Sequence, residues 1–109
     1  MTDVILVLMT APSMEKAAEL GRTLVEEQLA ACANLVPGLR SIYRWEGKVC
    51  DEPEVLMLLK TRAELFEPLR ARVAALHPYQ VPEVLRLGVE AGHLPYLDWV
   101  RESTRTAQR

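Results

Sequence analysis

The sequence lacks the features that mark a secreted, membrane-bound or nucleic-acid-binding protein. Its 109 residues include only two cysteines, whereas a small secreted domain normally carries a set of disulfides. Thirteen lysines and arginines are scattered among fifteen acidic residues, and the net charge is −2, so no basic field gathers phosphates. We therefore expect neither nucleic acid nor an anionic membrane as a partner.

The sequence also lacks a hydrophobic run long enough to cross a bilayer. The apolar stretch from Val4 to Met9 is far shorter than the roughly 20 residues of a membrane-spanning helix. It follows Asp3 instead of basic residues, and no small-residue cleavage site comes after it, which is unlike a signal peptide. These absences predict a cytoplasmic protein.

The two cysteines, Cys32 and Cys50, each lie in an apolar or strand-like stretch and do not form a CxxC pair. A free cysteine behaves as a small hydrophobic residue, which favours reduced thiols in the core over a disulfide. Without a CxxC pair, the sequence has no ready-made zinc or redox motif.

Hydrophobic residues make up 50% of the chain and charged residues 26%, a balance typical of one globular domain with one core. We predict a single domain over residues 1–109, divided into elements by periodicity and turn residues. Four strands are predicted, and the second of them bends at Pro37-Gly38. They run from Val4 to Met9, from Ala31 to Val36 and on from Leu39 to Trp45, from Val49 to Thr61 and from Glu83 to Val89. The predicted helices run from Ser13 to Gln28 or Leu29, from Ala63 to Leu76 and from Leu94 to Ser103. The tail, residues 104–109, is expected to fray.

This order of elements predicts an α+β domain with a ferredoxin-like βαββαβ antiparallel sheet, a long central hairpin and a short C-terminal helix. Two helices would cover one face of that sheet and leave the other open, where polar residues should alternate with apolar ones. Val4 to Met9 and Val55 to Leu59 are instead apolar at odd and even positions alike. Because an uncovered apolar face needs a partner, we predict a homo-oligomer.

Four segments, in this order along the chain, carry a resemblance to a known family. They are Leu29 to Gly38 (LAACANLVPG), Ser41 to Lys48 (SIYRWEGK), Leu59 to Thr61 (LKT) and His77 to Glu83 (HPYQVPE). With them the chain resembles the CutA family of divalent-cation tolerance proteins, from its first strand through Tyr96-Leu97-Asp98-Trp99. The resemblance implies a ferredoxin-like subunit in a homotrimer built like the trimeric PII signalling proteins, with the long hairpin reaching onto a neighbour.

The resemblance also implies tolerance of copper or other divalent cations, and it makes His77 and Cys32 candidate metal ligands. His77 ends a predicted helix, where an imidazole can cap carbonyls as well as bind a cation. Cys32 could supply a thiolate or be a buried small residue. A transition-metal site usually needs three or four ligands, and this chain has Met9 and Leu76 where some metal-associated relatives carry a cysteine and a second histidine.

Polar and aromatic residues that match the family's motifs predict a cleft between subunits. The expected ligand-binding residues are Trp45, Lys60, Tyr79 and Glu83. The expected interface residues are Tyr43, Trp45 and Trp99, because aromatic side chains dominate such contacts. Lys60 and Glu83 would be costly to bury alone, so we expect them to pair with each other or to meet a ligand.

Two functions from different classes follow. The first is a trimer that binds divalent cations, copper above all, through His77 with Cys32 and carboxylate or water ligands. The second is a PII-like sensor or scaffold whose inter-subunit clefts bind a small anionic metabolite or a partner protein. We expect no enzyme, because a cysteine and a histidine without an oxyanion element or an orienting partner do not make a nucleophilic site.

Overall fold

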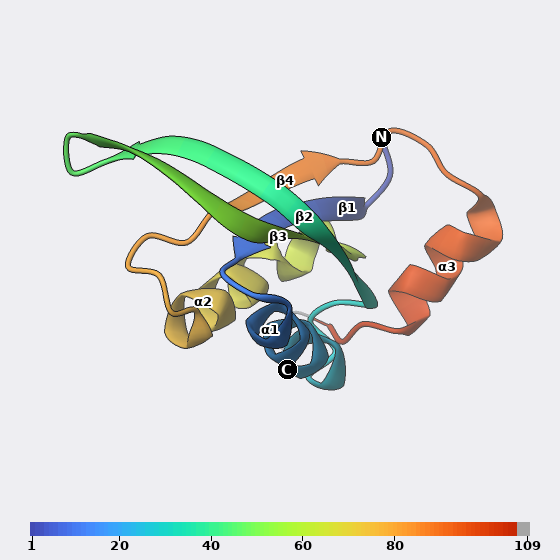
Figure 1. The fold of residues 1–109 in the computed structure, drawn as a ribbon. Coiled ribbons are helices and arrows are strands. Elements are labelled where there is room, and N and C mark those ends of the chain that lie inside the picture. The colour runs from blue at the N-terminus through green and yellow to red at the C-terminus, as the bar shows by residue number, and fades with distance from the viewer. Residues whose placement is uncertain (107–109) are drawn as a thin grey trace.

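An antiparallel sheet of four strands forms the centre of the computed structural model, which describes residues 1–106. The elements in chain order are β1 (Val4–Ala11), α1 (Met14–Glu26), β2 (Cys32–Trp45), β3 (Lys48–Arg62), a 3-10 turn (Ala63–Leu65), α2 (Phe66–Leu76), β4 (Val84–Gly88) and α3 (Leu94–Glu102). The strands lie in the order β2-β3-β1-β4, which is the ferredoxin-like order expected from the sequence. Figure 1 shows α1 and α2 together below the sheet, with the β2–β3 hairpin projecting beyond it.

The main core lies between the sheet and the helices α1 and α2. Odd-numbered residues of β1 point into it, and Ile5, Val7 and Met9 are at most 1% exposed. From β3, Met57 and Leu59 meet them and are fully buried. Successive side chains of a strand point to opposite faces, so the even-numbered residues of the same strands lie on the other face.

Helix α1 begins where the sequence predicts and ends earlier. The Ser13 hydroxyl accepts a hydrogen bond from the Lys16 N–H at 3.1 Å, which satisfies one of the free donors of the first turn. The helix ends at Glu26 because Gln28 takes a left-handed φ of 59°. The N–H groups of Leu29 and Ala30 then both reach back to the Leu24 carbonyl, a common helix ending.

Strand β2 continues through Pro37-Gly38, where the sequence predicts a bend, and the bend is a β-bulge. The register passes from Val36 opposite Leu56 to Leu39 opposite Glu54, so two residues of β2 oppose one of β3. This β-bulge is made possible by Gly38, whose φ is +86°. The extra residue moves every later side chain of β2 to the other face of the sheet.

The predicted helix from Ala63 to Leu76 is a 3-10 turn followed by α2. Pro68 is the third residue of α2, where its missing N–H costs no hydrogen bond within the helix. A proline is tolerated only in or next to the first turn of a helix, and Pro68 meets that condition.

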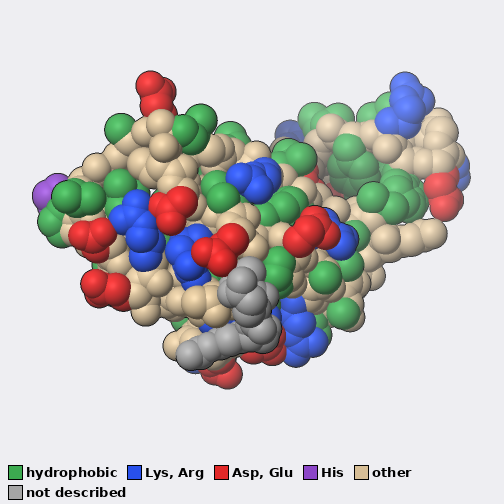
Figure 2. Space-filling view, turned by 180° about the vertical axis from the view of Figure 1, so that it is seen from behind, with side chains coloured by type: hydrophobic (Ala, Val, Ile, Leu, Met, Phe, Trp, Pro, Cys, Tyr) green, Lys and Arg blue, Asp and Glu red, His purple; other side chains and the backbone are tan. Residues whose placement is uncertain are grey.

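The second face of the sheet is apolar and only partly covered. Helix α3 packs over one end of it through a small cluster that contains Val4, Leu97 and Val100. Farther along, Leu85 of β4 pairs in register with Leu8 of β1 and is 56% exposed. Figure 2, which views the molecule from behind, shows hydrophobic side chains gathered on the projecting hairpin and charges of both signs mixed over the body. The apolar second face is therefore confirmed, and its cover by other subunits stays a prediction.

The start of the tail is ordered, which corrects the prediction that it frays. Thr104 is 9% exposed, and its hydroxyl donates to the Val100 carbonyl at 2.9 Å. The Arg105 N–H bonds to the Gln28 carbonyl at 2.9 Å, and the Arg62 guanidinium donates to the carbonyl of Arg105. These contacts attach the start of the tail to α3, to Arg62 at the end of β3 and to Gln28 just after α1. Residues 107–109 lie outside the described part.

No helix within residues 1–106 has the length and apolar character needed to cross a membrane.

Candidate functional site

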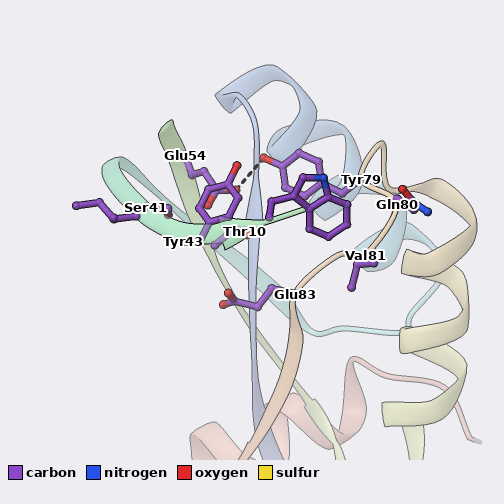
Figure 3. Close-up of a pocket in the computed structure, with 10 residues that line it drawn as sticks. Thr10, Ser41, Tyr43, Glu54, Tyr79, Gln80, Val81 and Glu83 are labelled. Carbon is purple, nitrogen blue, oxygen red and sulfur yellow. Dashed lines mark hydrogen bonds between the residues drawn. The ribbon is translucent and has the colours of Figure 1, made fainter. Parts of the chain in front are cut away.

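A cavity of about 620 Å³ opens between the β2–β3 hairpin and the loop that joins α2 to β4. Its lining residues are Thr10, Ser41, Ile42, Tyr43, Trp45, Glu54, Tyr79, Gln80, Val81 and Glu83. Figure 3 shows Tyr79 reaching toward Glu54 beside Tyr43, with Glu83 entering from the side of the loop. We call this space the hairpin cleft.

The β-bulge brings the aromatic residues of β2 into the hairpin cleft. Ser41, Tyr43 and Trp45 alternate along the strand, and all three line the cleft. The residues that they face on β3 are even-numbered and therefore lie on the same face of the sheet as Glu54. Tyr43 is 43% and Trp45 is 40% exposed, so both rings are available to a ligand or a neighbouring chain.

Tyr79 closes one side of the hairpin cleft by bonding to Glu54. Its hydroxyl donates to Oε2 of that carboxylate at 2.7 Å. Burial raises the pKa of Tyr79 well above its usual range, and the hydrogen bond to the Glu54 carboxylate raises it further. The phenol therefore stays protonated and orients Glu54, whose second oxygen Oε1 is not engaged by this bond.

His77 supports the cleft from behind and does not line it. The side chain is buried, with Nε2 at 2.8 Å from the Thr10 carbonyl and Nδ1 accepting the Tyr79 N–H at 3.1 Å. Since Nδ1 is the acceptor, Nε2 carries the proton and donates. The ring also packs on Tyr79, with centroids 4.7 Å apart. Both nitrogens are thus engaged within the chain, which speaks against a metal role. The carbonyl that the ring bonds belongs to β1, so the ring does not cap α2.

Lys60 and Cys32 belong to a different place, a polar cluster beside α3. The Lys60 ammonium donates to Oδ1 of Asn34. The Cys32 thiol lies 3.9 Å from the same oxygen and 3.8 Å from the Tyr96 hydroxyl. The Tyr96 ring in turn packs against Trp99, with centroids 5.5 Å apart.

The structure separates two pairs that the sequence suggests could act together. Lys60 opposes Leu6 of β1, whereas His77 bonds to Thr10, four residues farther along that strand, or roughly 13 Å. Within one chain, Cys32, which opposes Lys60, therefore does not meet His77. Lys60 likewise bonds to Asn34 and does not line the cleft that contains Glu83. Within residues 1–106 no three His, Cys, Asp or Glu side chains come together as a metal site.

The sequence shows Glu54 only as part of an acidic cluster, which could attract cations weakly, and does not assign it to the cleft. It follows Asp51 and Glu52, and such an acidic stretch usually marks a solvated strand edge. One signal could have assigned Glu54 to the cleft. Glu54 is even-numbered, like Leu56 and Leu58, and so lies on the strand face that the sequence predicts to be covered. With Glu54 and Glu83, the charged residues among those lining the cleft are both acidic.

The raised pKa values of the three tyrosines predict that the folded chain loses stability at alkaline pH. Burial is the main reason that the pKa values of Tyr43, Tyr79 and Tyr96 are raised in the folded chain. Their contribution to stability is therefore complete below the unfolded value of about 10 and falls as the pH rises above it. Tyr79→Phe should flatten this fall, as measured by urea unfolding at several pH values from about 9 to 11. A variant whose stability declines as steeply as that of the unaltered chain would contradict the burial of Tyr79.

Comparison with known proteins gives consistent matches over nearly the whole chain. A family model described as CutA1 divalent ion tolerance protein matches residues 5–103. The divalent-cation tolerance protein CutA of Thermus thermophilus is 54% identical over 98 residues, which cover 90% of this chain and 95% of that protein. Human protein CutA is 47% identical over 97 residues, which cover 89% of this chain and 54% of the human one. The chain thus spans about half the length of the human relative.

Solved structures agree with these matches. The Cut A1 structure from Thermus thermophilus superimposes with a TM-score of 0.91 at 52% identity, covering 94% of this chain and 99% of that one. CutA1 from Pyrococcus horikoshii gives a TM-score of 0.89 at 42% identity, with 94% and 99% covered. A family model that spans almost every described element, together with relatives of this identity, means that the chain belongs to the CutA1 divalent ion tolerance protein family.

Proposed function

We propose that the chain is a divalent-cation-binding protein that acts as a homotrimer and attracts its cations to the hairpin cleft. The observation that carries this proposal is the sign of the charge in the cleft, where the lining residues with charge are Glu54 and Glu83. Two carboxylates, with no lysine or arginine among the lining residues, favour a cation and oppose an anion. The divalent-ion tolerance family to which the chain belongs agrees with this chemistry.

The oxygen atoms that line the cleft indicate which cation it prefers. Carboxylates, the hydroxyls of Thr10 and Ser41 and the amide of Gln80 are oxygen ligands of the kind that manganese, magnesium and calcium prefer. Copper favours imidazole or thiolate, and His77 has both nitrogens engaged. We therefore propose a hard divalent cation over copper, and water or a neighbouring subunit would complete its coordination.

The homotrimer is supported by the apolar second face of the sheet and by the exposed hairpin. Leu85 and Leu87 of β4, with Ile42 and Val49 of the hairpin, are between 46% and 66% exposed in the single chain. Exposed apolar side chains of this kind favour association with further copies. The interface role proposed for Tyr43, Trp45 and Trp99 follows the same argument, since each is at least 40% exposed.

A second candidate function is a PII-like sensor or scaffold that binds a small molecule in the hairpin cleft. Its support is the cavity volume of about 620 Å³, which falls within the range of small-molecule sites and far exceeds one ion. In either case we propose a binding protein and not an enzyme, because Cys32 and His77 do not meet as a nucleophile and base.

We also propose that the chain works in a reducing compartment such as the cytoplasm. Its two cysteines are unpaired, and free thiols are typical of such a compartment. One relative, from Archaeoglobus fulgidus, is described as periplasmic.

Native mass spectrometry tests the cation proposal, with manganese(II) and copper(II) added separately in stoichiometric amounts. We expect a trimer that takes up manganese, and about tenfold weaker uptake after Glu54→Gln and Glu83→Gln are combined. Glu15→Gln, on the exposed side of α1, is the matched control and should bind normally. A trimer that takes up no divalent cation would overturn the proposal. Copper bound by the unaltered chain and lost in His77→Ala would favour the ligand set suggested by the sequence.

A further inference from the structure

We infer that the hairpin cleft accepts a small organic cation, an ammonium group on a short hydrocarbon body. The inference rests on the second candidate function, a cleft that binds a small molecule, and it names the chemical class of that molecule. It departs from the anionic metabolite expected from the sequence, because Lys60, the positive residue assigned to the cleft, lies elsewhere and bonds to Asn34.

The walls of the cleft suit a positive charge that carries hydrocarbon. Three aromatic rings line it, those of Tyr43, Trp45 and Tyr79, and the faces of such rings attract ammonium groups that have shed part of their water. Ile42 and Val81 add apolar surface. A bare metal ion would gain nothing from these apolar and aromatic walls, whereas an alkylated cation would be in contact with them.

The carboxylates are placed to complete the recognition. Tyr79 donates to Oε2 of Glu54 at 2.7 Å, which orients the carboxylate and leaves Oε1 for a ligand. Glu83 enters from the opposite side of the cleft (Figure 3). The raised pKa values of Tyr43 and Tyr79, to which Glu52 and Glu54 contribute, agree with a negative potential at this place. Ser41 and Gln80 offer hydrogen-bonding groups for a polar end of the ligand.

Three probes of nearly equal shape separate charge from size. Choline is the cation, its isostere with a quaternary carbon in place of nitrogen is the neutral form, and tert-butylacetate is the anion. Isothermal titration of the unaltered protein should show choline binding about tenfold more tightly than the neutral isostere, and no binding of the anion. Equal binding of choline and its neutral isostere, or preference for the anion, would overturn the inference.

Variants test whether the binding occurs in the cleft. Glu83→Gln and Trp45→Leu should each weaken choline binding about tenfold, while Glu15→Gln should leave it unchanged. Both cleft residues are exposed, so the subunit should still fold, and a native mass spectrum of each variant shows whether the assembly is kept. Choline binding that survives both substitutions would overturn the inference.

The outcome also distinguishes this inference from the proposed cation function. If manganese(II) binds and choline does not, the cation proposal stands and the organic-cation inference fails. If choline binds and no metal does, the reverse holds. If neither binds to an intact trimer, both fail.

Discussion

The Leu85→Asp variant should be a monomer under conditions in which the unaltered chain is a trimer. Leu85 lies on the second face of the sheet, in register with Leu8, and is 56% exposed in the single chain. In an assembly that covers this face, the new carboxylate would be buried without a partner, which costs several kcal/mol per subunit. That cost recurs at each of the interfaces of a closed ring.

The same substitution should hardly disturb the isolated subunit. A side chain that is more than half exposed to water gives up little packing, so we expect a change in unfolding free energy of about 1 kcal/mol or less. Native mass spectrometry should show a single-subunit mass of 12.3 kDa for the variant. A circular dichroism spectrum would confirm that the monomer is folded.

Met14→Asp is the matched control for the assembly. Met14 is 41% exposed and is the first residue of α1, on the helix side of the sheet, where an acidic residue near a helix N-terminus is favourable. This variant should remain a trimer. If Leu85→Asp also remains a trimer, the second face of the sheet is not the interface and the exposed hairpin becomes the next candidate.

His77→Ala should lower the free energy of unfolding by about 2 to 4 kcal/mol. The substitution removes a buried ring and its two hydrogen bonds, to the Thr10 carbonyl and from the Tyr79 N–H. It also removes the ring contact that holds Tyr79. The loop that carries Tyr79 and Glu83 should therefore loosen, and its amide hydrogens should exchange faster.

The chain's second histidine provides the control. His93 precedes α3 and makes no side-chain cap bond there, so His93→Ala should change the unfolding free energy by no more than about 0.5 kcal/mol. Urea unfolding of both variants measures the difference. A His77→Ala protein that keeps its stability but loses a bound cation would show that His77 is a ligand and not a supporting residue.

Much of the fold follows from short-range patterns that are readable in the sequence. The Ser13 cap, the amphipathic α1 and the strand–helix order each depend on residues within a few positions of one another. The apolar character of both faces of β1 is equally readable, and by itself it predicts an assembly. The family motifs similarly predict that Trp45, Tyr79 and Glu83 share a cleft between subunits. All three line the hairpin cleft, which is formed within one chain, and a cleft between subunits stays a prediction.

What the sequence does not reveal depends on strand register, which is not local. The bulge at Gly38 shifts the pairing of β2 against β3 by one residue, and a shift of one residue decides which face a side chain occupies. The bulge places Tyr43 and Trp45 on the face that carries Glu54. Lys60 is far from Glu83 for another reason, because it opposes Leu6 of β1, whereas β4 starts opposite Met9. Whether His77 is free to bind a metal likewise depends on the Thr10 carbonyl, 67 positions away in the chain. Periodicity and capping are properties of neighbouring residues, whereas a cleft is made by the packing of distant ones, so only the folded chain shows that Glu54 lines the cleft and that Lys60 does not.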